Sequence, residues 1–356
     1  MTRRGRTVTL SIGIFLLGVL LLAAYFMPVP YVRLRPGPVF DALGEVDGKP
    51  IVSVTGADTF ATDGSLNVTT VYEEGGPGST LTLLQAVRGW LDPTMTVVPR
   101  DLLYPPDAFD NKDAAKEQQQ QGVVQMQTSE QSAVVAALRY VGEPVNAIVV
   151  VDSTVPDTPA ADVLEAGDEI VKVDGVRIGQ ALDVRDQVSQ VSPGDPVTLE
   201  INRDGEAMTV QIETVESPDD PKRPMIGVIP TVSFDSPVDV QIVLANVGGP
   251  SAGLMFALST VDKLTPGPLA DGRAIAGTGT ISVRGRVGPI GGIAQKMAGA
   301  RADGAEVFLA PADNCSEVVG HIPNGLRVVR VATLAGAVKA LERLASGQGS
   351  LPTCAA

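Results

Sequence analysis

The sequence of 356 residues contains one histidine, His321, and only two cysteines. His321 lies near Pro323 and Asn324 in a glycine-flanked stretch that is typical of an exposed loop. Catalysis that depends on a histidine base is therefore not expected. The two cysteines do not have the spacing of metal ligands, so the sequence predicts neither a metal nor another cofactor.

Positive charge is also scarce, since the sequence has 27 Lys and Arg but 41 Asp and Glu, which gives a net charge of −14. No local run of Lys and Arg offers a basic face, so a nucleic-acid partner is not expected. Aromatic residues make up 4% of the chain and glycines number 38. With 44% hydrophobic residues, this composition is typical of a folded globular protein with many tight turns and two or more domains.

The segment 8–27 contains no charged residue. As a helix it would span about 30 Å, the thickness of the hydrocarbon core of a bilayer. The alternative is a cleaved signal peptide, but this run is long and large residues follow Ala23 and Ala24 where a cleavage site would need small ones. The sequence predicts a retained single-pass anchor at 8–27.

Three arginines precede the anchor, in the segment 1–7. They favour a cytoplasmic N-terminus, although Arg33 and Arg35 on the other side weaken the contrast. The prediction is a cell-membrane protein with everything beyond the anchor outside the cytoplasm. There Cys315 and Cys354 could form one disulfide or remain two free thiols.

Residues 36–142 combine strand and helix patterns, with a β-branched run at 66–72 and helical spacing at 81–91 and 129–140. Residues 107–122 are polar and predict an exposed connector. Further on, Val238 to Leu244 alternates apolar and polar residues, which indicates a half-buried strand. The fold class predicted for the whole chain is α+β.

Residues 143–216 carry the patterns G-D-x-I-x-x-V-D-G, from Gly167, and P-G-x-x-V-x-L-x-I-x-R-x-G, from Pro193. This pair of patterns resembles a PDZ domain of the type found in bacterial proteases. The resemblance implies a small β-rich domain that binds an extended peptide by adding it as a strand to a sheet edge. A spacer domain without a bound peptide is the alternative.

The position of the peptide site follows from the same resemblance. A backbone nest for a terminal carboxylate is placed at the start of the domain, with the helix near 182–191 as the wall of the groove. The residues predicted to bind peptide are Val145, Asn146, Ala147 and Ile148.

Ser251 lies in Gly248-Gly249-Pro250-Ser251-Ala252-Gly253, directly before a run that is apolar on nearly every side. Such a run indicates a buried helix, whose N-terminal N–H groups favour negative charge. Backbone N–H groups at Gly249, Ser251 and Ala252 could therefore hold an oxyanion. The alternative is a serine that only caps the helix.

Lys296 shares the apolar stripe of a short helix with Ile293, Met297 and Ala300. Burial lowers the pKa of a lysine amine and so favours the neutral form, which can take a proton from a serine. To lower the pKa from the usual value of about 10.4 to near 7, burial must destabilise the charged form relative to the neutral form by roughly 4 to 5 kcal/mol. An ammonium group that reaches solvent along its flexible stem is the alternative.

The order G-G-P-S-A-G, then A-G-T-G-T-I-S-V-R-G-R-V-G-P-I-G-G-I-x-Q-K, is similar to the proteolytic domain of Lon peptidases, the S16 family, and to their membrane-anchored bacterial relatives that contain a PDZ domain. The match covers residues 225–345, followed by a tail at 346–356. The helix at 125–140 also resembles a helix that precedes the catalytic region in Lon. The PDZ domain is then inserted into a Lon-type α+β domain.

This resemblance implies that Ser251 is the nucleophile, Lys296 the general base and Thr278 a threonine close to both. It also implies a possible homo-oligomer. No G-x-x-x-x-G-K-[ST] motif occurs in the sequence, so cleavage of peptides or unfolded segments without ATP is expected. The sequence thus predicts a membrane-anchored serine endopeptidase.

Two other interpretations remain. Carboxy-terminal processing peptidases also join a PDZ domain to a Ser/Lys pair, but the sequence around their serine is not found here. The second is a non-catalytic PDZ adaptor at the membrane that retains a peptidase fold. Self-cleavage or casein digestion that depends on Ser251 distinguishes a peptidase from an adaptor.

Overall fold

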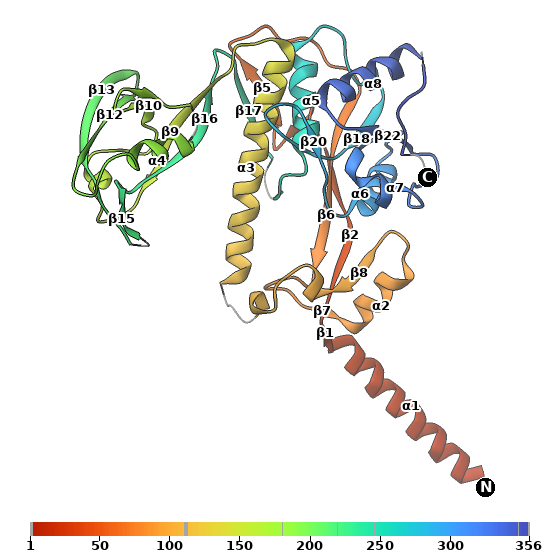
Figure 1. Cartoon of the computed structure of the whole chain (residues 1–356). Coiled ribbons are helices and arrows are strands. Elements are labelled where there is room, and N and C mark those ends of the chain that lie inside the picture. The colour runs from red at the N-terminus through yellow and green to blue at the C-terminus, as the bar shows by residue number, and fades with distance from the viewer. Residues whose placement is uncertain are drawn as a thin grey trace. The chain divides into compact units, whose positions relative to one another are not determined.

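The computed structural model describes residues 3–109, 113–179, 181–218, 220–244, 247–347 and 349–354. The chain divides into two compact units. One, here called the discontinuous unit, consists of Met1–Gly142 and Val238–Ala356; the other, the inserted unit, is Glu143–Pro237. The inserted unit interrupts the sequence of the discontinuous unit, as the colours of Figure 1 show.

A mixed six-stranded sheet forms the centre of the discontinuous unit (Figure 1). Its order is β22 (Arg327–Val331), β21 (Val307–Pro311), β18 (Ala274–Gly277), β6 (Ser65–Glu74), β2 (Tyr31–Asp41), β8 (Thr96–Pro99). The first four strands are parallel, whereas β2 is antiparallel to both of its neighbours. A smaller pair, β5 (Val52–Thr55) with β17 (Asp239–Ile242), joins the two sequence segments of this unit.

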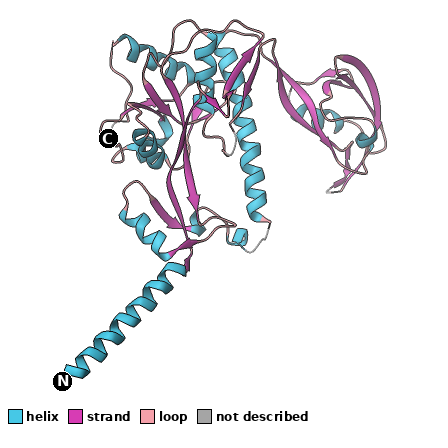
Figure 2. Cartoon of the chain, turned by 180° about the vertical axis from the view of Figure 1, so that it is seen from behind, coloured by secondary structure: helices cyan, strands magenta, loops and turns pink. Residues whose placement is uncertain are grey.

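Helices cover both faces of this sheet (Figure 2), because parallel strands need apolar cover on each side. In β21 every residue is buried, and alternate side chains serve different cores. Leu309 belongs to the core made with α3 (Ala114–Val141), α5 (Gly253–Leu264) and α8 (Leu334–Ser346). Phe308 and Ala310 belong to the core made with α6 (Ile293–Ala302) and α7 (Cys315–Val318).

Helix α3 is one continuous helix of 28 residues. The exposed connector predicted at 107–122 is therefore wrong from Ala114 onward, while 110–112 lie outside the described residues. The run of Ala, Lys, Glu and Gln is polar but has high helix propensity, and the second half of the helix is anchored in the core by Ala133 and Ala137. The helix ends where Gly142 takes a left-handed conformation with φ 87°.

The N-terminal region begins with helix α1 (Arg3–Phe26). Its end joins β1 (Pro28–Val29), which pairs with β7 (Leu81–Thr82), and α2 (Leu83–Leu91) follows. Thr82 and Gln85 cap α2 reciprocally, which explains why the helix predicted over 81–91 begins two residues later. Within the part of the chain that the structure describes, no helix combines the length and apolarity needed to cross a membrane, and the anchor at 8–27 stays a prediction.

Cys315 and Cys354 form a disulfide with a Cα–Cα distance of 5.1 Å. The bond connects α7 with the C-terminal tail. From the sequence alone, two free thiols were an equal alternative. Pro352 also accepts a hydrogen bond from the Arg330 N–H at 2.9 Å, so the tail is held against β22 as well.

The inserted unit contains a sheet of order β13 (Glu206–Glu213), β12 (Pro196–Arg203), β10 (Glu169–Val173), β9 (Asn146–Thr154), β16 (Val228–Asp235). The remaining elements are η3 (Pro159–Asp162), β11 (Val176–Arg177), α4 (Ala181–Val188), β14 (Val215–Ser217) and β15 (Asp220–Met225). The unit extends to Pro237, beyond the predicted end at 216, because β16 pairs with β9 along its whole length. Residues 225–235 thus belong to this unit and not to the predicted catalytic segment.

Candidate active site

Ser251, Thr278 and Lys296 lie in hydrogen-bond contact in the discontinuous unit. The Lys296 Nζ donates to the Ser251 Oγ at 2.7 Å and to the Thr278 Oγ1 at 3.0 Å. Ser251 lies in the turn just before α5, Thr278 directly follows β18, and Lys296 belongs to α6. Ser251 and Lys296, which separate patterns in the sequence predicted, and Thr278, which the resemblance implied, therefore lie together in the fold.

The segment before α5 holds Ser251 in place. Gly249 has φ +87°, a conformation that favours glycine, and it redirects the chain just before the helix. The Ser251 carbonyl accepts hydrogen bonds from the Gly279 N–H at 2.8 Å and from the Thr278 hydroxyl at 3.0 Å. These bonds tie the serine to the end of β18, so its hydroxyl is positioned by the central sheet.

Lys296 lies on the buried face of α6 together with Ile293, Met297 and Ala300, as the apolar stripe predicted. Only 2% of Lys296 is exposed. Burial lowers the pKa of its amine to about 7, because the interior disfavours the charged form. About half of the amine is thus neutral near pH 7, and this form can accept a proton.

The predicted oxyanion donors differ in their availability. The Gly249 N–H donates to the Gly122 carbonyl in α3 at 3.0 Å, so the prediction for Gly249 is wrong in this arrangement. The N–H groups of Ser251 and Ala252 find no acceptor among the described residues. Two N–H groups at the start of α5 therefore remain for an oxyanion.

Two hollows flank the segment that leads to Ser251. One, of about 810 Å³, is lined by the loop at 247–249 and by Gln118, Gln121 and Gln125 of α3. The other, of about 200 Å³, is lined by Pro250, Thr280 and Ile281 together with residues of α3 from Val124 to Ser132. The sequence did not predict this role of α3, because Gln118 and Gln121 were assigned to a connector, and Gln125 was assigned to a helix without a part in the site.

The predicted peptide residues of the inserted unit lie at the start of β9 and just before it. Asn146, Ala147 and Ile148 pair with Asp235, Phe234 and Ser233 of β16. Together with Val145 they line a hollow of about 710 Å³. One edge of β9 at these residues is occupied by β16. On the other edge, among the described residues, β10 pairs with β9 only at Val150, so a peptide could add there only over the first few residues of β9.

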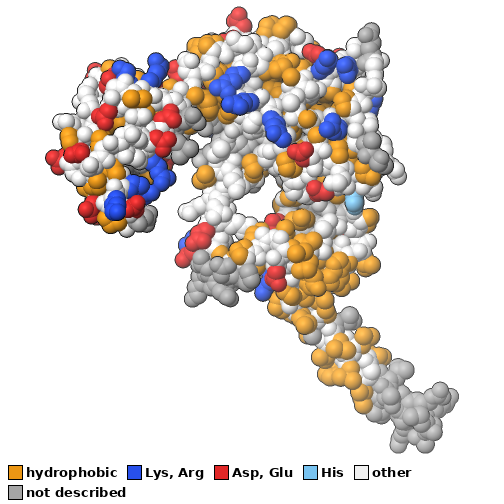
Figure 3. Space-filling model, viewed as in Figure 1, with side chains coloured by type: hydrophobic (Ala, Val, Ile, Leu, Met, Phe, Trp, Pro, Cys, Tyr) orange, Lys and Arg blue, Asp and Glu red, His pale blue; other side chains and the backbone are white. Residues whose placement is uncertain are grey.

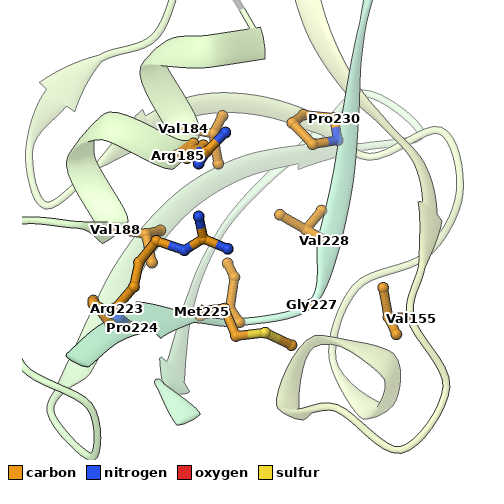
Figure 4. A pocket seen from close by; sticks show the side chains of 11 residues that line it. Val155, Val184, Arg185, Val188, Arg223, Pro224, Met225, Gly227, Val228 and Pro230 are labelled. Atoms are coloured by element: carbon orange, nitrogen blue, oxygen red, sulfur yellow. The ribbon is translucent and has the colours of Figure 1, made fainter. Parts of the chain in front are cut away.

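A second groove, of about 420 Å³, fits strand addition better (Figure 4). It lies between α4 and the start of β16, which is an edge strand among the described residues. Val184 and Val188 form one wall and Val228 the other, with the side chains of Arg185 and Arg223 at the groove. The sequence placed the helical wall at this site but not the strand.

Two family models match this chain. Residues 243–342 match the Lon protease (S16) C-terminal proteolytic domain, and residues 123–214 match a PDZ domain. The first segment includes Ser251, Thr278 and Lys296. The chain therefore contains the proteolytic domain of a serine peptidase of the Lon type, together with a PDZ domain.

Curated relatives carry the name Lon protease. The chain is 27% identical to Lon protease of Azospirillum brasilense over 49% of this chain and 20% of that protein. It is 39% identical to Lon protease 2 of Herpetosiphon aurantiacus over 25% and 11%, and 31% identical to Lon protease 1 of Bacillus subtilis over 38% and 18%. The chain thus spans a fifth or less of the length of these relatives.

Solved structures match a smaller part of the chain. The PDZ domain of an SdrC-like protein from Listeria monocytogenes is 29% identical and has a TM-score of 0.22. This match covers 23% of this chain and 85% of that structure. A solution structure from Geobacillus thermodenitrificans is 32% identical over 23% of this chain and 94% of that structure, with a TM-score of 0.21.

Proposed function

We propose that this chain is a serine endopeptidase in which Ser251 is the nucleophile and Lys296 the general base. The observation that carries the proposal is the contact of 2.7 Å between the Lys296 Nζ and the Ser251 Oγ, made by an amine that burial keeps partly neutral. A serine hydroxyl is a weak nucleophile until a base within hydrogen-bond reach accepts its proton.

In the first half of the reaction the neutral Lys296 takes the Ser251 proton while the Oγ attacks the carbonyl carbon of a peptide bond. The N–H groups of Ser251 and Ala252 stabilise the oxyanion. The Lys296 ammonium then gives its proton to the leaving amine, and an ester to Ser251 remains. Thr278 holds the amine by accepting a hydrogen bond from it at 3.0 Å.

In the second half water attacks the ester carbonyl, and Lys296 again accepts the proton. Collapse of this intermediate returns the proton to the Ser251 Oγ and releases the new carboxyl end of the substrate. No external oxidant, metal or nucleotide enters either half. The motif G-x-x-x-x-G-K-[ST] is absent from this sequence, so we infer that cleavage by this chain does not require ATP.

The substrates are peptides or unfolded protein segments. An extended chain fits the hollows on both sides of the 247–250 segment, where α3 supplies amide and hydroxyl groups along its length. The inserted unit recruits such segments by pairing them with the edge of β16 beside α4, where no other described strand pairs with it. Both steps favour polypeptide without stable structure, because the backbone must be exposed.

We further propose that α1 anchors the chain in the cell membrane, with the active site outside the cytoplasm. Residues 8–27 carry no charge, and the side chains of Phe15, Leu20 and Leu22 on this helix are exposed. The disulfide between Cys315 and Cys354 agrees with an oxidising compartment.

Casein hydrolysis by the full chain in detergent, without nucleotide, tests the proposal. Wild type should digest casein, whereas Ser251→Ala and Lys296→Met should not. Ser346→Ala and Lys263→Met are matched controls, because Ser346 is exposed on α8 and Lys263 is at the far end of α5 from Ser251. Casein digestion by either site variant at the wild-type rate contradicts the dyad, and peptide binding without cleavage by wild type indicates an adaptor.

A further inference from the structure

An exposed apolar surface surrounds the junction between α1 and the discontinuous unit. Helix α2 buries Ala86 and Gly89 on one face. Its other face exposes Trp90 by 53% and Leu91 by 80%. Here we call this region the α2 surface. It comprises Leu84, Val87, Trp90 and Leu91 of α2 with Leu102 and Leu103, of which Leu102 ends η1 (Arg100–Leu102).

Backbone contacts place the α2 surface next to the end of α1. The Leu83 N–H donates to the Met27 carbonyl at 3.0 Å, and the Arg100 N–H donates to the Pro30 carbonyl at 3.2 Å. The rings of Tyr31 and Trp90 meet edge to face with centroids 5.3 Å apart. Figure 3 shows hydrophobic side chains along α1 and again at the end of the unit where α1 joins it.

The composition of this junction is that of a membrane interface. Tyr25 and Trp90 have rings with an apolar body and a polar end, which favour the level of the lipid headgroups. The charges near the α2 surface are balanced, because Asp92 and Asp101 accompany Arg88 and Arg100. Association with lipid would therefore depend on apolar burial and only weakly on salt.

We propose that the α2 surface inserts into the interfacial layer of the bilayer next to α1 and gives the discontinuous unit a second contact with lipid. This inference rests on the proposed anchoring by α1, which brings the surface to the level of the headgroups. Helix α2 then lies in the plane of the interface, with Leu84, Val87 and Leu91 among the upper acyl chains. Ala86 and Gly89 remain packed on the unit.

Trp90 is the only tryptophan of the chain, so its fluorescence reports on this surface alone. The full chain is reconstituted in phosphatidylcholine vesicles that contain lipids brominated at different depths of the acyl chain. Bromine near the headgroup should quench Trp90 at least about twofold more than bromine near the bilayer centre. Raising the salt from low to high concentration should leave the quenching nearly unchanged.

Matched variants separate the α2 surface from α1. Leu91→Glu should reduce the quenching of Trp90 severalfold, whereas Ile322→Glu, at a residue 44% exposed in a loop of the same unit, should not. Casein hydrolysis in detergent should be unchanged in both, because neither residue lines the hollows beside Ser251. Equal quenching in wild type and Leu91→Glu overturns the proposal.

Extraction of the vesicles with alkaline carbonate follows α1 separately. If the chain resists extraction but brominated lipids do not quench Trp90, the α2 surface does not contact lipid and only this inference fails. If the chain is extracted, the proposed anchor fails and the inference fails with it. If Trp90 is shielded only as the protein concentration rises, the surface joins copies of the chain, which also overturns a lipid contact.

Discussion

Both units of the molecule bury an ionisable side chain, but they treat the charge in opposite ways. In the inserted unit Asp168 is 1% exposed and accepts two hydrogen bonds of 2.7 Å from Arg203. Burial works to raise the pKa of Asp168, but the hydrogen bonds from Arg203 and the Glu165 N–H outweigh it and lower the pKa. In the discontinuous unit burial alone lowers the pKa of Lys296 to about 7.

The difference indicates which buried group can do chemistry. Asp168 stays charged over the physiological range and joins β10 to β12 through Arg203, so it acts in stability. Lys296 contacts two hydroxyl groups, which leave its amine able to gain or lose a proton near neutral pH. A perturbed pKa near 7 next to a serine is therefore the feature that distinguishes the candidate active site.

Lys296→Met should separate the catalytic role of the buried amine from its effect on stability. The casein hydrolysis rate should fall at least about a thousandfold, because Ser251 loses its base. The free energy of unfolding at pH 7 should nevertheless rise by at least about 1 kcal/mol, since a buried amine with a lowered pKa costs stability that a thioether does not. Denaturant unfolding beside the activity assay measures both, and an inactive variant less stable than wild type contradicts the comparison.

The pH dependence of hydrolysis and of stability should also distinguish Lys296 from Asp168. Below pH 7 kcat/KM should fall about tenfold per pH unit, to about a hundredth at pH 5, because only neutral Lys296 is active. The folded pKa of Lys296 is lower than the unfolded value, so the unfolded chain binds the extra proton and stability rises from about pH 7 to 10.5. A rate that is independent of pH between 5 and 8 would contradict this assignment.

The pKa of Asp168 is lowered by folding because its charged form is stabilised, whereas the pKa of Lys296 is lowered because its charged form is destabilised. The contribution of Asp168 to stability is present above the unfolded pKa and is lost only as the pH falls through the lowered folded pKa. Hydrogen exchange of the β9 and β10 amides should therefore stay slow at pH 5, where hydrolysis is already weak. Rapid exchange of these amides at pH 5 would show that the ion pair does not hold the unit in this range.

Asp168→Asn removes the charge that pairs with Arg203. The inserted unit should lose stability, because the neutral amide of Asn is a weaker hydrogen-bond partner for the Arg203 guanidinium than the buried carboxylate of Asp168. Hydrogen exchange of the β10 and β12 amides measures the loss. Hydrolysis of a short peptide should be unaffected, and Lys172→Gln, which breaks the more exposed pair with Glu200, should cost less than about 1 kcal/mol.

Thr278→Val should give the smallest of these effects. The side chain would no longer accept a hydrogen bond from the Lys296 amine, so kcat should fall about tenfold, and the midpoint of the pH profile should move below 7 because the ammonium form loses a partner. Thr278→Ser should restore both values. A loss of kcat with an unchanged midpoint, or no rescue by serine, would indicate only a packing role.

Local patterns in the sequence identified two residues of the main site as candidates. A glycine-rich turn before an apolar run predicts a serine at a helix start, and a lysine within an apolar stripe predicts a buried amine; the structure brings Ser251 and Lys296 to 2.7 Å. The contact itself depends on parallel pairing of β18 with β6 and β21, which spacing alone does not specify. The resemblance to Lon peptidases, and not the local patterns, predicted that Ser251, Thr278 and Lys296 lie close together.

Other parts depended on partners far away in the sequence. The role of β16 is decided by its pairing with β9, and the N–H of Gly249 is taken by Gly122 of α3. Neither partner is recognisable from local periodicity. Polarity was also misleading in α3, where glutamines with high helix propensity form a wall beside the active site instead of a connector.

Direct titration of Lys296 is the sharpest test of a dry, partly neutral base beside Ser251. The side-chain carbon next to the amine, labelled with ¹³C and assigned by comparison with Lys296→Met, reports the protonation state by NMR. We expect a midpoint at about pH 7, well below the usual value of about 10.4 for a lysine amine. A midpoint near the ordinary value of about 10.4 would contradict it, because the amine would then be charged throughout the range in which the enzyme works.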